Sequence, residues 1–216
     1  MTEIIAILNQ KGGAGKTTLS TNIARSLQLD ECEVLLVDSD PQGSARDWNA
    51  AGAGDGDGAL VPVIGLDRST LAKDIQSVKG GKDFIIIDGA PQIAELAVAA
   101  IKCSDLILIP VQPSPYDVWA CDDLVDVIKA RQEVTDGKPL AVFIISRAIK
   151  NTNLSKEVGE ALEGYGLPVF KTFTSQKVIY AKSAATGSTV LDFKNGNNSA
   201  EKEIISIKNE ILEFLK

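Results

Sequence analysis

Short apolar runs alternate with amphipathic stretches along the chain, and this alternation predicts its architecture. The apolar runs are rich in Val, Ile and Leu, and they lack the period-two pattern of a strand with one solvated face. Continuous apolar strands of this kind are typical of parallel sheets that helices cover on both sides. The predicted strands are Glu3–Leu8, Glu33–Val37, Asp83–Ile87, Asp105–Ile109 and Leu140–Ile145.

The amphipathic stretches between these runs predict helices. Regular alternation of strands and helices implies right-handed crossovers between parallel strands. We therefore expect an α/β fold with a doubly wound, mostly parallel sheet and helices on both faces, forming a single domain over residues 1–216. The predicted helices are Lys16–Leu29, Ala45–Ala51, Thr70–Val78, Ile93–Lys102, Tyr116–Glu133, Leu154–Glu163 and Ala200–Lys216.

A glycine-rich segment, KGGAGKTT at Lys11–Thr18, lies directly between the first predicted strand and the first predicted helix. It fits the phosphate-binding loop, in which glycines let backbone N–H groups wrap a polyphosphate at a helix N-terminus. In such a loop, Lys16 reaches the β- and γ-phosphates and the Thr17 hydroxyl binds Mg²⁺. The nucleotide-binding residues predicted here are Lys11, Gly12, Gly13, Ala14, Gly15, Lys16, Thr17 and Thr18.

The ordinary phosphate-loop pattern does not require a lysine at position 11. Taken alone, Lys11 could be a solvated surface residue. The full pattern K-G-G-x-G-K-[ST] resembles the deviant Walker A motif of the ParA/MinD family of P-loop ATPases. This resemblance implies that Lys11 crosses a nucleotide-sandwich dimer to contact the partner's ATP, so we count Lys11 with Lys16 among the catalytic candidates.

Two acidic segments that follow predicted strands extend the resemblance. VDSDPQG at Val37–Gly43 resembles the family segment in which Asp38 belongs to the magnesium shell and Asp40 positions the attacking water. IIIDGAP at Ile85–Pro91 resembles a Walker B strand, with Asp88 as the carboxylate on the magnesium side. Carboxylates at these positions suit Mg²⁺ and its bound waters. We expect Thr17, Asp38 and Asp88 at the metal, with both aspartates acting through water.

A proline-rich segment, PVQPSPYD at Pro110–Asp117, follows the next predicted strand. By itself it indicates a rigid turn. It also resembles the segment of small ParF-like ParA proteins that lines the ATP-dependent dimer interface, so we place Pro113 among the nucleotide-binding candidates. In the wider family the base is gripped after later strands, which makes Arg147 a candidate together with Ser146 and the Phe173–Thr174 region.

Charge and composition narrow the function classes. The chain has no histidine, which excludes His-ligated metals and His-based catalytic triads. Its net charge of −7 excludes a globally basic nucleic-acid binder. Residues 139–216, however, carry ten Lys and Arg against eight Asp and Glu, and residues 164–191 contain lysines but no acid. This stretch is either a solvated lysine face or part of a DNA-contacting patch. The candidates are Lys171, Lys177 and Lys182 within it, together with Lys150, which precedes it.

The resemblance implies a Mg²⁺-dependent ATPase with weak intrinsic activity that works as a switch in DNA partition. ATP would hold a homodimer, able to assemble further, that binds DNA non-specifically. A small centromere-binding (ParB/ParG-like) protein would stimulate hydrolysis and release the DNA. The three cysteines, Cys32, Cys103 and Cys121, lack C-x-x-C spacing, and no apolar run approaches a membrane span. We expect a cytoplasmic, nucleoid-associated protein with no membrane partner.

Other functions within and beyond the family stay open at this stage. A ParA-like ATPase can position a protein cargo such as a carboxysome or a chemoreceptor cluster, and the sequence does not separate this cargo from DNA. A MinD-like membrane-associated cell-division ATPase would need a terminal helix with a basic face, whereas the last predicted helix is net acidic. An iron-protein-like electron carrier, a small-molecule P-loop enzyme and a bacterial tyrosine kinase each lack supporting residues.

Overall fold

The computed structural model describes residues 1–216 except 53–60, 92–93, 150–153 and 194–198. Among the described residues, six parallel strands form one sheet in the order β3-β2-β4-β1-β5-β6. The strands are β1 (Glu3–Ile7), β2 (Val34–Asp38), β3 (Val63–Gly65), β4 (Phe84–Asp88), β5 (Leu106–Val111) and β6 (Leu140–Ile145).

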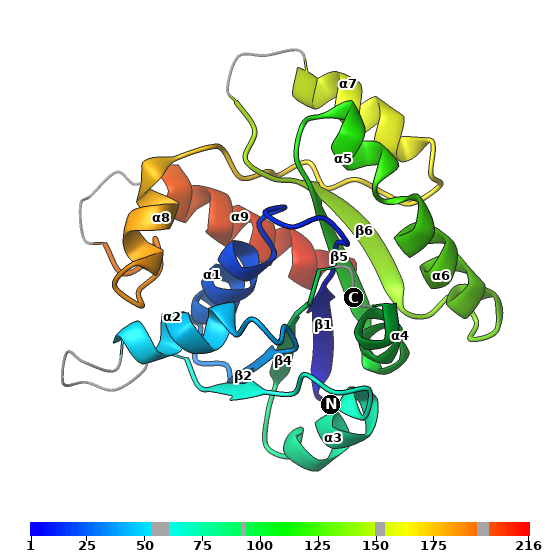
Figure 1. Ribbon diagram of the computed structural model, residues 1–216. Coiled ribbons are helices and arrows are strands. Elements are labelled where there is room, and N and C mark those ends of the chain that lie inside the picture. The colour runs from blue at the N-terminus through cyan, green and yellow to red at the C-terminus, as the bar shows by residue number, and fades with distance from the viewer. Residues whose placement is uncertain (53–60, 92–93, 150–153, 194–198) are drawn as a thin grey trace.

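Helices connect successive strands and lie on both faces of the sheet (Figure 1). None of the helices in the described part of the chain has the length and apolar content that a membrane span requires. The helices are α1 (Lys16–Leu29), α2 (Ser44–Gly52), α3 (Leu71–Val78), α4 (Ala94–Cys103), α5 (Pro115–Trp119), α6 (Asp122–Glu133), α7 (Leu154–Glu163), α8 (Val178–Ala184) and α9 (Ser199–Phe214).

Two hydrophobic cores follow from this arrangement, one on each face of the sheet. On one face, apolar side chains of α1, α2 and α9 pack against β-strand residues such as Ile5 and Leu36. On the other face, side chains of α3, α4, α6 and α7 pack against residues such as Ile87 and Phe143. Both faces of the sheet are covered, and apart from Glu3 and the terminal Asp38 and Asp88 the central strands β1, β2 and β4 are apolar, which confirms the predicted doubly wound architecture.

The structure differs from the sequence prediction mainly in its short elements. The helix predicted over 116–133 is divided into α5 and α6, because the Cys121 N–H turns back to the Val118 carbonyl and both side chains enter the core. Strand β3 has only three residues, and α8 buries only Ser183, so neither has a detectable apolar pattern. The bounds of α1 and β6 agree with the prediction.

The parallel strands bring three chain segments to one edge of the sheet. In the register, Ile7 of β1 and Asp38 of β2 both lie beside Asp88 of β4. The loops that leave the carboxyl ends of these three strands are therefore neighbours, at the place where open α/β sheets bind ligands.

Removing a buried contact of α9 tests its packing on the sheet. Ile207 is fully buried, whereas Ile205 on the same helix is 37% exposed. We expect Ile207→Ala to lower the free energy of unfolding by about 2–4 kcal/mol, measured by urea denaturation. The matched Ile205→Ala change should cost less than about 1 kcal/mol. Equal losses for the two variants would contradict the packing of α9 described here.

Candidate nucleotide-binding site

The loop between β1 and α1 has the backbone of an anion-binding site. Gly13 and Gly15 adopt φ values of +76° and +96°, in a region that side-chain-bearing residues rarely occupy. Gly15 is the N-cap of α1 and supplies no side-chain cap. The first N–H groups of α1 are therefore available to an anion, which the positive end of the helix also favours.

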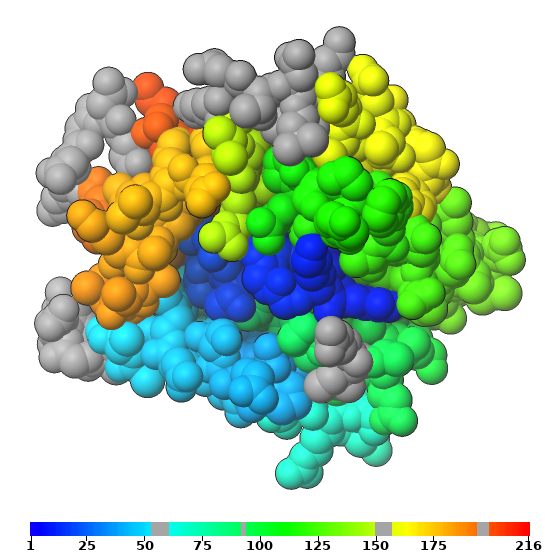
Figure 2. All heavy atoms as spheres, turned by 45° about the horizontal axis from the view of Figure 1, so that its top comes forward, coloured from blue at the N-terminus to red at the C-terminus, as the bar shows by residue number. Residues whose placement is uncertain are grey.

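A cavity of about 800 Å³ opens beside this loop (Figure 2), a size that suits a nucleotide. In Figure 2 the loop lies between α2 and the segment that contains α8. The phosphate-loop side of the cavity is formed by Gly12, Gly13, Gly15, Lys16, Thr17 and Thr18. The α2 side includes Asp40, Ser44, Asp47, Trp48 and Pro91, and the α8 side includes Arg147, Thr174, Ser175, Gln176, Lys177 and Tyr180.

The ammonium group of Lys16 lies inside the loop. Its Nζ donates a hydrogen bond to the Lys11 carbonyl at 3.0 Å, and the residue is 7% exposed. Burial lowers the pKa of Lys16, and the carboxylates of Asp88 and Asp40 oppose this shift. A charged donor in so confined a place is well suited to bind phosphate oxygens.

Thr17, which lines the cavity, contacts Asp88 at the end of β4. The Thr17 hydroxyl donates to Asp88 Oδ2 at 2.7 Å, and the Ser20 hydroxyl donates to Asp88 Oδ1 at 3.0 Å. Burial, together with the nearby Asp38 carboxylate, raises the pKa of Asp88 to about 7, although the Thr17 and Ser20 hydrogen bonds lower it. The cost of burying this carboxylate favours a cation beside it.

Asp38 has a different environment from the one expected of a magnesium-shell residue. Its carboxylate is fully buried and accepts hydrogen bonds from the backbone N–H groups of Asp40, Ala45 and Arg46. The Arg46 Nε also lies 3.4 Å from Asp38 Oδ2. Asp38 therefore holds the loop that carries Asp40 and the start of α2, a role that the sequence did not reveal. Its place in the magnesium shell stays a prediction.

Arg46 fixes the same loop from the other side. Its Nη2 donates to the Asp40 carbonyl at 2.8 Å and lies 3.3 Å from Asp67 Oδ2. The guanidinium fits here because Gly65 has no side chain: a Cβ at Gly65 would lie 2.9 Å from Arg46 Nη1. Asp40, our candidate for positioning the attacking water, lines the cavity. The contacts of Asp38 and Arg46 hold the loop that carries it.

Lys11 points away from the cavity that its own loop forms. Its Nζ lies 2.6 Å from Asp117 Oδ2, on α5, and Asp117 is 4% exposed. Among the described residues, Asp117 Oδ1 is buried without a hydrogen-bond partner. The Lys11 ammonium is thus held at the proline-rich segment, whose Gln112 side chain in turn donates to the Gly13 carbonyl at 2.9 Å.

The structure brings some of the predicted base-binding candidates to the cavity. Arg147 is among its lining residues, and its Nη1 donates to the Gly13 carbonyl at 3.3 Å. Ser146 donates to the Ala14 carbonyl at 2.7 Å, and Thr174 also lines the cavity. Neither Phe173 nor Pro113 is among the lining residues in the described part of the chain.

The four lysines predicted to contact DNA fall into different environments. Lys171 and Lys182 are exposed. Lys177 instead lines the nucleotide cavity and forms an ion pair with Glu203 of α9, so it is not a free surface cation. Lys150 lies outside the described residues. The absence of acidic residues from 164–191 gave no sign of the Lys177–Glu203 ion pair, because Glu203 lies outside that stretch.

Contact between α2 and the turn after α8 closes one side of the cavity. The Trp48 indole N–H donates to the Ser188 carbonyl at 3.0 Å. Gly187, at φ +63°, lies so close to Gly52 that a Cβ at Gly187 would meet the Gly52 nitrogen at 2.0 Å. Helix α2 and the turn after α8 are therefore fixed relative to each other.

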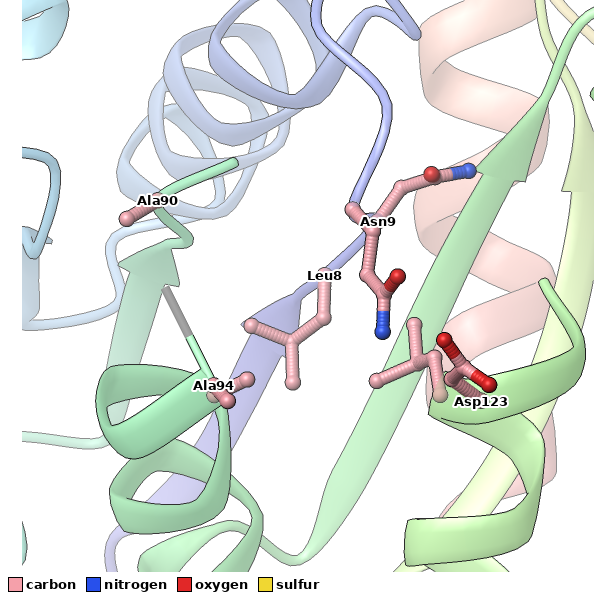
Figure 3. Close-up of a pocket in the computed structure, with 8 residues that line it drawn as sticks. Leu8, Asn9, Ala90, Ala94 and Asp123 are labelled. Atoms are coloured by element: carbon pink, nitrogen blue, oxygen red, sulfur yellow. The ribbon is translucent and has the colours of Figure 1, made fainter. Parts of the chain in front are cut away.

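A second, smaller cavity of about 270 Å³ lies on the other side of residues 8–10 (Figure 3). Leu8 and Asn9 lie between the Ala90–Ala94 side and Asp123 of α6. This cavity shares no lining residue with the larger one and has no basic group in its lining. The larger cavity is therefore the candidate for a nucleotide.

The contact between Thr17 and Asp88, beside the large cavity, fits Mg²⁺. The Thr17 hydroxyl and the Asp88 carboxylate offer oxygen ligands, which Mg²⁺ prefers. In the described part of the chain, no group of three or more His, Cys, Asp or Glu side chains could hold a metal ion. A Mg²⁺ ion here would therefore need further ligands from bound phosphates and water, as is usual for this ion.

Comparisons with known proteins find a family of nucleotide-binding domains. Residues 5–191 match the model of the CobQ/CobB/MinD/ParA nucleotide binding domain. The chain is 32% identical over 211 residues to maintenance of carboxysome distribution protein A of Halothiobacillus neapolitanus, covering 96% of this chain and 95% of the relative. It is 26% identical over 227 residues to chromosome partitioning protein ParA of Myxococcus xanthus, covering 87% and 80%.

Among solved structures, the septum site-determining protein MinD of Pyrococcus horikoshii, complexed with Mg-ADP, superposes with a TM-score of 0.74. The two chains are 19% identical, and the match covers 100% of this chain and 99% of MinD. At this level of identity the likeness shows the fold.

Removing the Lys16 ammonium tests the phosphate end of the site. We expect Lys16→Ala to weaken nucleotide binding roughly 10- to 100-fold, the equivalent of one charge-assisted hydrogen bond or two, measured by isothermal titration calorimetry. Lys73→Ala, at an exposed lysine of α3, serves as the control and should leave affinity unchanged. Wild-type affinity of the Lys16→Ala protein would show that the nucleotide binds elsewhere.

Proposed function

Because the chain belongs to the CobQ/CobB/MinD/ParA family of nucleotide-binding domains, we propose that it is a Mg²⁺-dependent ATPase that acts as a molecular switch. In this proposal ATP occupies the large cavity and holds two copies of the chain together, and hydrolysis releases them. The Mg-ADP complex of the structurally similar MinD supports the choice of an adenine nucleotide with Mg²⁺.

One observation carries the proposal: the two lysines of a single phosphate loop point in different directions. Lys16 faces the cavity of its own chain, whereas Lys11 is absent from the described lining of that cavity and pairs with Asp117. A cation in this loop that does not serve its own cavity is available to a neighbouring chain. In a face-to-face dimer, Lys11 would exchange Asp117 for the phosphates of the partner's nucleotide.

The residues of the site also indicate slow chemistry. Phosphoryl transfer depends on positioning and charge neutralisation more than on a strong base. The loop N–H groups and Lys16 would hold the phosphates, Mg²⁺ would neutralise their charge, and Asp40 would orient the attacking water. Two arginines lie close to the site. Arg46 is already held by Asp38 and Asp67, and Arg147, our candidate for binding the base, donates to the Gly13 carbonyl. Enzymes of this class without a supplied arginine turn over at roughly 10⁻⁴ to 10⁻² s⁻¹.

We place this switch in DNA partition. The ATP-bound dimer would bind DNA non-specifically through Lys171 and Lys182, with Lys150 as a further candidate, and a small centromere-binding protein would stimulate hydrolysis. Dimerisation doubles the number of phosphate contacts, which steepens the salt dependence by about 0.9 in log–log slope for each phosphate. The similarity to a chromosome partitioning protein supports this cargo.

A second candidate cargo is a protein assembly. The 32% identical relative is named for carboxysome distribution, so a ParA-like positioning function with a protein cargo has comparable support. The two candidates differ in the partner that stimulates hydrolysis. A neighbouring gene for a small centromere-binding protein would favour DNA, whereas a cargo-binding adaptor would favour the protein assembly.

Variants of the Lys11–Asp117 pair test the switch. Lys11→Ala alone would leave the buried Asp117 carboxylate without its cation, which in itself destabilises the chain. We therefore compare Asp117→Asn with the double variant Lys11→Ala/Asp117→Asn. For the single variant, the rate of ATP hydrolysis per chain should still rise with protein concentration. The double variant should hydrolyse ATP at least tenfold more slowly. Phosphate release measured over a range of protein concentrations gives both rates.

At protein concentrations too low for dimerisation, both variants should bind ATP with similar affinity, measured by equilibrium titration, because Lys11 does not line its own cavity. Equal hydrolysis by the two variants would contradict a role for Lys11 in a partner's site. Turnover of many molecules per second by the isolated wild-type protein would contradict the slow switch.

Charge reversal tests the DNA-contacting face. Lys171→Glu/Lys182→Glu should abolish ATP-dependent DNA binding at moderate salt, because each change replaces an attraction to phosphate with a repulsion. Lys73→Glu/Lys102→Glu, at exposed lysines of α3 and α4 across the sheet, is the matched control and should retain binding. Fluorescence anisotropy of labelled duplex DNA provides the measurement. Undiminished binding by the first variant would rule out this patch.

A further inference from the structure

The last helix carries two carboxylates that contact a segment on the rim of the large cavity. Glu203 and Glu210 lie seven residues apart on α9, a spacing that puts them on one helix face. Both accept hydrogen bonds from residues 171–180, the stretch that leads into α8. In Figure 1, α8 lies beside the first turns of α9.

Glu210 binds the beginning of this segment, and Glu203 binds the part that follows. Glu210 accepts the backbone N–H groups of Lys171 and Thr172 at 2.8 and 3.0 Å. Glu203 accepts the Ser175 N–H at 3.0 Å and the Tyr180 hydroxyl at 3.1 Å. The Ser175 hydroxyl and the Lys177 ammonium group also donate to Glu203. Both oxygens of Glu203 are thus used, by donors from three different residues.

Backbone hydrogen bonds from Thr174 and Gln176 to Ile145 and Ala148 also hold this segment. The Glu203 contacts matter because they are the ones that orient its side chains, namely those of Ser175, Lys177 and Tyr180. Helix α8 has seven residues, and Ser183 is the only one of them that is buried. The Glu203 and Lys177 side chains are 13% and 20% exposed, so their ion pair is largely shielded from water. Burial raises the pKa of Glu203, but the hydrogen bonds from Lys177 and Ser175 outweigh this effect and lower it. Charge-assisted hydrogen bonds of this kind are among the stronger polar contacts in proteins.

Glu203 itself does not line the cavity, whereas the three residues that it holds all do. They form one wall of the cavity, which Figure 2 shows across the phosphate loop from α2. With the phosphates fixed at the loop, this wall is the part of the cavity left for the base and ribose.

We propose that Glu203 is a positioning residue for recognition of the nucleoside, acting through Ser175, Lys177 and Tyr180. The inference rests on the proposed function, namely that ATP occupies the large cavity. Its consequence is that α9 belongs to the nucleotide site as well as to the hydrophobic core. Loss of the Glu203 carboxylate releases the wall and weakens binding of the nucleoside while the phosphate loop stays intact.

Two ligands separate these effects: Mg-ATP, and Mg-tripolyphosphate, which has the phosphates without the nucleoside. Glu203→Ala is expected to raise the dissociation constant of Mg-ATP about tenfold and to leave that of Mg-tripolyphosphate within twofold of wild type. In hydrolysis, KM for ATP rises while kcat at saturating ATP is retained. Isothermal titration calorimetry and steady-state phosphate release measure these values.

Two further variants keep the test decisive if Glu203→Ala does not fold. Glu203→Gln keeps the size of the side chain but loses its charge, and Ser175→Ala/Tyr180→Phe removes two donors while keeping Glu203. Both are expected to raise the dissociation constant of Mg-ATP several-fold and leave Mg-tripolyphosphate unaffected. Glu213→Gln is the matched control on α9, since no hydrogen bond or ion pair joins the Glu213 side chain to the described 171–180 segment.

The possible results separate the inference from the proposed function. Unchanged Mg-ATP binding by the Glu203 variants overturns the inference and leaves the ATPase proposal standing. Equal weakening of both ligands also overturns it, because that result indicates a general loss of structure. Failure of the wild-type protein to bind Mg-ATP overturns the proposed function and the inference together.

Discussion

The conformation of the loop at residues 12–18 is the constraint on which the rest of the site depends. Positive φ angles at Gly13 and Gly15 aim backbone N–H groups at one point, and α1 directs its N-terminus to the same point. The loop cannot move far, because β1 is in the centre of the sheet and α1 packs against both the sheet and α9. An anion bound here has a fixed position, and Thr17, Asp88 and Asp40 are arranged around it.

Contacts of buried charged side chains connect this anion site to α2 and α5, the elements that would move. Asp88 contacts the loop through Thr17, whereas Asp38, beside it in the sheet, holds the start of α2. Lys11 contacts α5 through Asp117. A phosphate that changes the charge balance at the loop therefore acts on two neighbouring elements, which is what a nucleotide-dependent switch needs. Glu203 adds a third link, from α9 to the opposite wall of the cavity.

Local motifs in the sequence were enough to predict the residues around the phosphate loop. The other contacts of the site join residues that are distant in the sequence, and these contacts were not predicted. Lys16, Thr17 and Asp88 were predictable because a phosphate loop is contiguous and because parallel strands end at one edge. The pairing of Lys11 with Asp117, and of Lys177 with Glu203, joins residues far apart in the chain, and no spacing rule gives such pairs. Short elements such as β3 and α8 were missed because three or seven residues carry too little periodicity.

The central claim is that ATP joins two copies of this chain, and the mass of the particle in solution tests it most directly. Sedimentation equilibrium of the 22.9 kDa chain, with Mg²⁺ and a non-hydrolysable ATP analogue, should give about twice the mass of one chain. With Mg-ADP it should give the mass of a single chain. A single-chain mass with the analogue, at protein and nucleotide concentrations that saturate the site, would contradict the account.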